Sequence, residues 1–160
     1  MAERPKKQVL FAELLALLTS DLETALRAER ASQEAATHEE AKPENDKDTR
    51  ALEQSYLARG QSKRTEELRV GLGQTEAIAA KLPAKGGPIA LGSLVEAEEE
   101  GDAVWFLMAP ARGGTKLGAS VQVVTPSSPL GRALLGKHEG DDVDVAVAKG
   151  TRALSILRID

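Results

Sequence analysis

Residues 83–88 read Pro83-Ala84-Lys85-Gly86-Gly87-Pro88 and divide the chain into two parts of different composition. Two prolines and a glycine pair can continue neither a helix nor a strand. Before this stretch Ala, Leu, Glu, Arg and Gln dominate, which are good helix formers. After it glycines are frequent, and Val, Ile and Leu alternate with polar residues. We therefore expect a helical domain over residues 1–83, a linker over 84–88 and a strand-rich domain over 89–160.

Apolar residues recur in the first part at the three- to four-residue spacing of a helix, at Leu10, Leu14, Leu18, Leu22 and Ala25. A second helical pattern follows Asp48 and continues to Leu82. Pro43 interrupts the helical pattern, and Asn45 and Asp46 are turn formers. These features predict an antiparallel coiled-coil hairpin of two long helices, joined by a polar turn, the tip, at about residues 39–48.

Five strand-like runs and one short helix are expected in the second part. The strands are predicted at 89–97, 103–108, 121–124, 142–147 and 153–159. Ser128, Pro129 and Gly136 mark a helix between the third and fourth strands, as N-cap, first-turn proline and C-terminal stop. The prediction is an α+β chain, in which a small antiparallel sheet with one helix follows the hairpin.

The composition excludes several classes of protein. Without cysteine, the 160-residue chain has no disulfides, thiolate metal sites or cysteine nucleophile. The net charge of −4 argues against nonspecific duplex binding as the main activity. No apolar run reaches the roughly 18 residues of a membrane span, and no signal-peptide pattern begins the sequence. We expect a monomeric cytoplasmic protein that has no contact with membranes.

The predicted tip is rich in carboxylates. Between residues 34 and 48 lie Glu34, Glu39, Glu40, Glu44, Asp46 and Asp48, against Lys42 and Lys47. Oxygen ligands of this kind suit hard cations such as Mg²⁺. The spacing matches no self-contained calcium loop, so a bound ion would have to be shared with a partner. The alternative is that the charges only solvate the end of the hairpin.

Four basic residues on the second helical pattern are candidates for contact with RNA phosphates: Arg50, Arg59, Lys63 and Arg64. Glu53, Glu66 and Glu67 lie among them, so ion pairs along the helix are the alternative explanation. The glycine-rich segments match neither a P-loop nor a dinucleotide-binding motif, and no self-sufficient active site is visible.

The segment Ser128-Pro-Leu-Gly-Arg-Ala-Leu-Leu-Gly-Lys137, followed after two residues by Gly140-Asp-Asp-Val-Asp-Val145, resembles the C-terminal signature of the Gre family of bacterial transcription elongation factors. The helical hairpin, the linker and the strand-rich half stand in the order of that family. The resemblance implies an FKBP-like C-terminal domain that binds RNA polymerase, and a coiled coil that enters the secondary channel of the polymerase.

The resemblance also implies a function. Such factors stimulate cleavage of backtracked RNA by the polymerase's own active site, so the chain would be an accessory factor with no cofactor of its own. The partners would be RNA polymerase, the nascent RNA 3′ end and DNA within the complex. Tip residues Glu44, Asn45, Asp46 and Asp48 would assist catalysis, and Glu44 and Asp46 would share the catalytic Mg²⁺ of the polymerase.

The family's tip pattern is an aspartate, two residues, then Glu-Asn. Glu44-Asn45 matches the pair, and Ala41 stands where the family has its aspartate. In the C-terminal part, Ser128 and Pro129 match the family's polymerase-contacting loop, and the role extends to Ser127 and Leu130.

Two alternatives to cleavage stimulation stay open at the level of sequence. One is a cleavage-inactive regulator that occupies the secondary channel with its altered tip. The other is a peptidyl-prolyl isomerase or chaperone, since the C-terminal half resembles an FKBP-like fold. The few aromatic residues, 2% of the chain, count against that last function because such pockets are lined by them.

Overall fold

The computed structural model describes the backbone of residues 3–40, 47–118 and 120–160, and their side chains except at 36–40, 47–49 and 51. The chain forms two compact units, one of Ala16–Leu72 and one that joins Met1–Leu15 to Gly73–Asp160. Two helices, α1 (Lys7–Glu40) and α2 (Lys47–Ala80), run through both units. The expected change from helix to strand does occur between Ala80, the end of α2, and Leu94, where the first strand begins.

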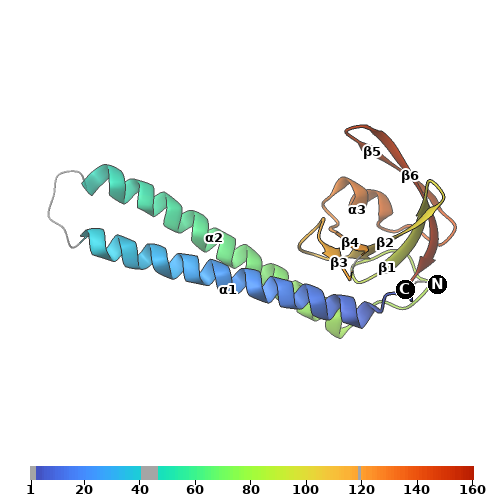
Figure 1. Ribbon diagram of the computed structural model, residues 1–160, viewed down its shortest axis with the longest axis horizontal. Coiled ribbons are helices and arrows are strands. Elements are labelled where there is room, and N and C mark those ends of the chain that lie inside the picture. The colour runs from blue at the N-terminus through green and yellow to red at the C-terminus, as the bar shows by residue number, and fades with distance from the viewer. Residues whose placement is uncertain (1–2, 41–46, 119) are drawn as a thin grey trace. The chain divides into compact units, whose positions relative to one another are not determined.

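The Ala16–Leu72 unit is a hairpin of two helices, as the apolar spacing predicts (Figure 1). Leu18 of α1 and Thr65 and Leu68 of α2 are buried in it. The helices are also joined by the Ser62 hydroxyl, which donates to Glu29 Oε1 at 2.9 Å. The predicted tip lies partly outside the described residues, which leave out 41–46.

The second unit is built on one sheet of six strands in the order β3-β4-β2-β1-β6-β5 (Figure 1). The strands are β1 (Leu94–Glu99), β2 (Asp102–Met108), β3 (Lys116–Leu117), β4 (Val121–Val124), β5 (Asp142–Val147) and β6 (Gly150–Ile159). The fold class is confirmed: a helical hairpin precedes a small sheet that carries one short helix, α3 (Pro129–Leu134).

Three details of the predicted sheet are wrong. The sheet is mixed, because β2 and β4 pair in parallel while all other neighbours are antiparallel. It also has a sixth strand, β3, whose two residues are too few to show an alternating pattern. The first strand starts at Leu94 and not at Ile89, because the Ile89 backbone pairs with the end of the α3 segment: its N–H donates to Lys137 and its carbonyl accepts from Gly136.

One face of the sheet packs on α3. Alternate strand residues supply this core, including Val95, Phe106, Val124 and Ile156, and Leu134 of α3 fills it from above. Because side chains alternate across a strand, the residues between them point to the other face. On that face Leu94, Leu107, Val121 and Val123 are also buried, so the sheet is covered on both sides.

Helical residues 7–15 and 73–80 cover this second face of the sheet. Leu10, Phe11 and Leu14 are each at most 3% exposed, and Gly118 donates its backbone N–H to Glu13 Oε2 at 2.9 Å. A Cβ on Gly92 would lie 3.0 Å from Ile78 Cγ2. The start of α1 and the end of α2 therefore belong to the same compact unit as the sheet.

Candidate functional site

The segment that enters α3 is a tightly bonded turn at Ser128. The Ser128 hydroxyl donates to the Thr125 carbonyl at 2.8 Å and accepts the N–H of Gly131 at 3.0 Å. Its backbone is extended, with φ −73° and ψ 156°, as an N-cap requires, and Pro129 occupies the first helical position. Sequence reasoning predicts both roles correctly.

Gly131 allows this turn to close. A Cβ at this position would overlap the Thr125 carbonyl oxygen and would lie 2.7 Å from the Thr125 carbonyl carbon, a distance that real Cβ atoms do not reach. Glycine is required here for close approach of two backbone segments, since Gly131 is not among the glycines with positive φ.

The outer side of the turn is fixed by Arg132, whose Nη1 donates to the Ser127 carbonyl at 2.7 Å. Of the four residues predicted to bind a partner, Ser127 and Pro129 are exposed, Ser128 is half-buried and Leu130 is 8% exposed in the core. The turn therefore presents Ser127 and Pro129 to solvent, while Leu130 anchors it beneath.

A cavity of about 550 Å³ lies beside this turn. Its wall is formed by β4, the start of α3, the β5–β6 hairpin and the glycine pair that precedes β3. The lining residues are Gly113, Gly114, Gln122, Val123, Val124, Thr125, Ser128, Pro129, Leu130, Val145, Ala146, Val147, Ala148 and Arg152. Most of them are apolar, and none of these described residues is aromatic, unlike the pockets expected of a prolyl isomerase.

The one charged residue of the lining, Arg152, is already paired. Its Nε donates to Glu99 Oε2 at 2.8 Å and its Nη2 donates to Glu99 Oε1 at 3.2 Å. The guanidinium also stands 6.0 Å from the centre of the Phe106 ring, within the range of a cation–π contact. With its charge balanced, the cavity offers an apolar surface edged by a few hydroxyl and amide groups, which suits an apolar side chain of a partner.

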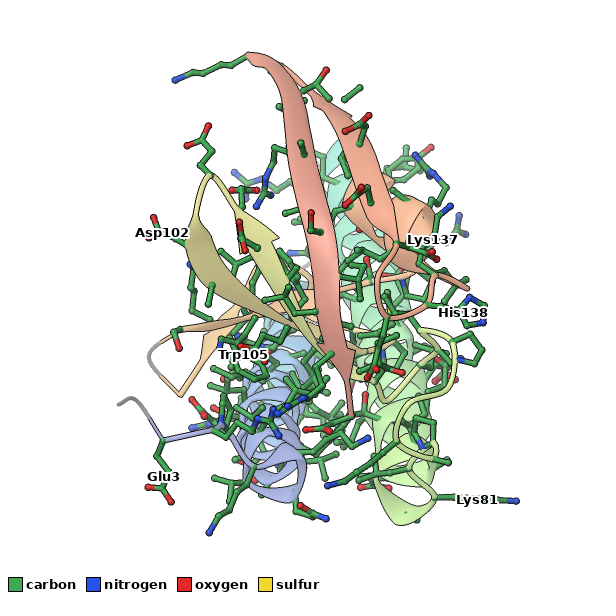
Figure 2. The ribbon with its side chains drawn as sticks, turned by 90° about the vertical axis from the view of Figure 1, so that its right-hand side faces the viewer. Glu3, Lys81, Asp102, Trp105, Lys137 and His138 are labelled. Atoms are coloured by element: carbon green, nitrogen blue, oxygen red, sulfur yellow. The ribbon has the colours of Figure 1, made fainter. Side chains whose placement is uncertain are left out.

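Sequence reasoning missed much of this cavity. The glycine pair, Val145, Val147 and Arg152 are brought to the Ser128 turn only by strand pairing, and no short motif joins them. Lys137, the last residue of the first signature segment, and His138 after it are exposed beyond α3 and do not line the cavity (Figure 2).

The predicted tip site is only partly within the described chain. Glu44, Asn45 and Asp46 lie outside the described residues, and Asp48 lies in the first turn of α2 with its side chain not described. The four basic candidates Arg50, Arg59, Lys63 and Arg64 are exposed on α2. The roles predicted for all eight residues stay predictions.

The described part of the chain holds neither a metal-binding cluster nor a membrane-spanning helix. Within residues 3–40, 47–118 and 120–160, no three His, Asp or Glu side chains are grouped so that they could hold a metal ion. None of the helices in these ranges combines the length and the hydropathy that a membrane span needs.

Comparisons with known proteins agree with the motif at Ser128. The family model "Transcription elongation factor, GreA/GreB, C-term" matches residues 84–160. The chain is 32% identical over 133 residues to transcription elongation factor GreA of Syntrophobacter fumaroxidans, which covers 81% of this chain and 80% of that protein. It is 33% identical over 67 residues to GreA of Azorhizobium caulinodans, and this match spans 42% of this chain and only 40% of the relative's length.

Among solved structures, the chain is similar to GreA factor homolog 1 (Gfh1) of Thermus thermophilus, at 21% identity and a TM-score of 0.40, over 91% of this chain and 94% of that chain. The family assignment rests on the sequence matches, and above all on the relative that is matched over four fifths of its length. By these matches, the chain belongs to the GreA/GreB family of transcription elongation factors.

Proposed function

We propose that this protein binds RNA polymerase through the Ser127–Leu130 turn and the apolar cavity beside it. Membership of the family is the reason to name RNA polymerase as the partner, and the turn and the cavity form the proposed binding surface. The observation that carries the proposal is the rigid Ser128 turn, which holds Pro129 exposed at the rim of the cavity. Preorganised backbone loses little entropy on binding, which is what a docking surface needs.

The chemistry of the cavity indicates what part of the polymerase would fill it. Burial of one Leu, Ile or Phe side chain of the polymerase would contribute about 1.5–3 kcal/mol. Hydroxyl groups of Thr125 and Ser128 at the edge would bond to polar groups around that side chain. Because Arg152 is neutralised by Glu99, an acidic anchor on the polymerase is not required.

The proposed action of the docked factor is to rescue backtracked complexes. The hairpin would lie in the secondary channel, with Glu44, Asn45, Asp46 and Asp48 near the RNA 3′ end. The catalytic Mg²⁺ of the polymerase would supply the Lewis-acid chemistry for phosphodiester hydrolysis. Glu44 and Asp46 would help to hold one of them, and Asn45 and Asp48 would orient the attacking water. The factor is then an accessory to the polymerase in the cytoplasm, acting as a monomer.

Ala41 makes this last step testable, because the family has an aspartate at that position. The assay measures RNA cleavage in a stalled, backtracked complex to which the full chain is added. We expect cleavage with the native protein, slower cleavage with Glu44→Ala, and faster cleavage with Ala41→Asp. A native protein that binds the polymerase without stimulating cleavage would contradict the proposal and favour the channel-occupying regulator.

Docking is tested separately from cleavage. Replacement of Ser128 and Pro129 together by alanine is expected to weaken binding of the full chain to core polymerase, measured by equilibrium pull-down. Since the tip is untouched, any residual cleavage at saturating factor should proceed at the native rate. Unchanged affinity in the double variant would contradict the assignment of the Ser128 turn as the docking surface.

A further inference from the structure

The strand β5 forms one edge of the sheet and is paired on one side only. It comes last in the strand order, and its six residues, Asp142–Val147, all pair with β6 without a register shift. The strand at the opposite edge, β3, has only two residues. The edge of a sheet presents backbone N–H and C=O groups with which another strand can pair. β5 is therefore the long open edge of this sheet.

Ile156 of β6 shows which backbone groups of β5 are already used. Its N–H donates to the Asp141 carbonyl and its carbonyl accepts the Gly140 N–H, both at 2.8 Å, so these groups point to the β5 side of β6. Backbone groups alternate in direction along a strand, so every second residue of β6 before Ile156 also points to β5. The β5 partners of those residues, which are bonded to β6, are Val143, Val145 and Val147.

The three residues between these turn their backbone N–H and C=O groups outward: Asp142, Asp144 and Ala146. Within the part of the chain that the structure describes, these outward groups have no hydrogen-bond partner. All three residues are exposed. At about 3.4 Å per residue, the outward groups extend over about 14 Å, which suits an added strand of about five residues.

The outer part of the β5–β6 hairpin is a ribbon of two strands. β6 pairs with β1 only from Ile159 to Ser155, whereas its pairing with β5 continues to Gly150. Figure 2 shows this hairpin extending past the turn that joins β1 and β2. Two strands alone are marginally stable in water, and a third strand is usually needed. An added strand beside β5 would supply the third.

The two faces of β5 differ in chemistry. On one face Val143 and Val145 are each 4% exposed, in the core below α3. On the other face lie the exposed side chains of Asp142 and Asp144, and neither forms an ion pair with any described residue. Asp142 accepts the Ser155 hydroxyl at 2.7 Å. Side chains directly opposite on paired strands lie about 4.5–5.5 Å apart, so cations on an added strand would face these carboxylates.

We propose that β5 accepts a strand from another protein, an extended segment in which lysine or arginine alternates with apolar residues. Its backbone pairs with the outward groups of β5, its cations face Asp142 and Asp144, and its apolar residues extend the face of Val143 and Val145. In this mode of recognition the main-chain hydrogen bonds give affinity and alternate side chains give specificity. The inference goes beyond the proposed function, which uses the Ser127–Leu130 turn and the cavity.

The two carboxylates argue against other occupants of the edge. A second copy paired through β5 would bring the Asp142 and Asp144 carboxylates of both chains together, and like charges on facing strands are destabilising. The phosphates of a nucleic acid would be repelled for the same reason. Charges on an edge strand also protect it from self-pairing. A basic segment is the one kind of strand that these charges attract.

The test follows the amide resonances of the ¹⁵N-labelled full chain while a short, end-blocked peptide of alternating lysine and valine is added. We expect saturable shifts along β5. Exchange of the outward amides of Asp142, Asp144 and Ala146 with solvent should become slower. The amides of Val143 and Val145 are already bonded to β6 and should change little. This alternation distinguishes backbone pairing from attraction between charges alone.

Two variants separate the backbone from the charges. Ala146→Pro removes one outward N–H and none of the bonds to β6, a position at which an edge strand tolerates proline. The loss of one hydrogen bond should weaken peptide binding roughly two- to tenfold. Asp144→Lys should weaken it to a similar extent, roughly two- to tenfold, by placing like charges opposite one another. Its matched control is Glu98→Lys, an exposed acid of β1 that β6 separates from β5, which should bind like the native protein.

A second peptide, with the same lysines and valines in two blocks, should bind more weakly because it cannot match both faces of β5. Four results would overturn the inference. They are no shift along β5 up to the solubility limit of the peptide, shifts without slower exchange of the outward amides, equal affinity for the two peptides, and shifts that depend on protein concentration before any peptide is added. The last result would assign the edge to a second copy.

Peptide binding and polymerase docking can fail independently. The variant in which Ser128 and Pro129 are both replaced by alanine leaves β5 unchanged and should bind the peptide like the native protein. Failure of the peptide experiments in a protein that still binds polymerase would reject this inference alone and leave the proposed function standing.

Discussion

The carbonyl oxygen of Thr125 lies so close to the α-carbon of Gly131 that no side chain fits between them. The same carbonyl accepts the Ser128 hydroxyl at 2.8 Å and the Ser128 N–H at 3.1 Å. These two bonds, the bond from the Gly131 N–H to Ser128 Oγ and the close approach therefore fix the turn that holds Pro129 at the rim of the apolar cavity. A change at any of these residues should move the proposed docking surface before it disturbs the sheet.

Gly131→Ala is expected to damage both stability and docking. The added Cβ must push the Thr125 backbone or α3 away, which should lower the free energy of unfolding by at least the roughly 1–3 kcal/mol of an overpacked core. Denaturant unfolding measures the first effect and polymerase pull-down the second. Native stability in this variant would mean that the approach of Thr125 and Gly131 is looser than described.

Ser128→Ala should have a smaller effect of the same kind. It removes the hydroxyl that caps the Gly131 N–H, and loss of such a cap costs about 0.5–2 kcal/mol. The backbone bond from Ser128 to Thr125 is retained, so the turn should persist with more motion. Ser128→Thr keeps a hydroxyl and is the control. Its melting temperature in thermal unfolding should be closer to that of the native protein than the melting temperature of Ser128→Ala is.

Gly60→Ala should stabilise the protein. Gly60 lies inside α2, and a Cβ built on it has no neighbour within 4 Å. Alanine at such a helical position is favoured by about 0.5–1 kcal/mol, because glycine loses more backbone freedom on folding. Chemical denaturation of the two proteins side by side checks this. A destabilised Gly60→Ala would show that the hairpin needs the freedom of glycine here.

We expect Lys7 to make the free energy of unfolding depend on pH in the alkaline range. Burial lowers the pKa of its ammonium below the ordinary 10.5, Asp160 opposes this shift and Lys85 adds to it. The folded protein therefore releases this proton before the unfolded chain does. Stability should rise with pH between the lowered pKa and about 10.5, and then level off.

Lys7→Met removes this dependence. The variant should be more stable than the native protein at neutral pH. The difference between their free energies of unfolding should narrow as the pH rises from the lowered pKa of Lys7 to about 10.5. Urea unfolding at a series of pH values measures it, with Lys6→Met as the control for the loss of one positive charge next door. A difference between Lys7→Met and native protein that stays constant with pH would contradict the account.

The sequence predicts those parts of the fold that depend on neighbours along the chain. Ser128, Pro129 and Gly136 carry the start and stop of α3 within one short segment, and the helical periods of α1 and α2 are long enough to be unambiguous. Strand β3 could not be predicted because Lys116–Leu117 shows no period.

Features that join distant segments could not be predicted. The parallel pairing of β2 with β4 and the ion pair of Arg152 with Glu99, 53 residues apart, depend on the order of strands in the sheet. The cavity has the same origin: Val147 and Gly113 meet at the Ser128 turn only in the folded sheet. The docking residues predicted from the motif are thus one side of a surface whose other side the sequence does not reveal.

The central claim is that the cavity beside the Ser128 turn docks on RNA polymerase, and Val147 offers the most direct test of it. Val147 lines the cavity and is 42% exposed, so Val147→Asp should fold normally while placing a charge on the docking surface. Leu157→Asp is the matched control, because Leu157 is 47% exposed on the neighbouring strand and does not line the cavity.

The measurement is the dissociation constant of the full chain for core polymerase, after circular dichroism has shown that both variants are folded. The account predicts that Val147→Asp weakens binding at least tenfold and that Leu157→Asp binds like the native protein. Equal affinity of Val147→Asp and the native protein would contradict it.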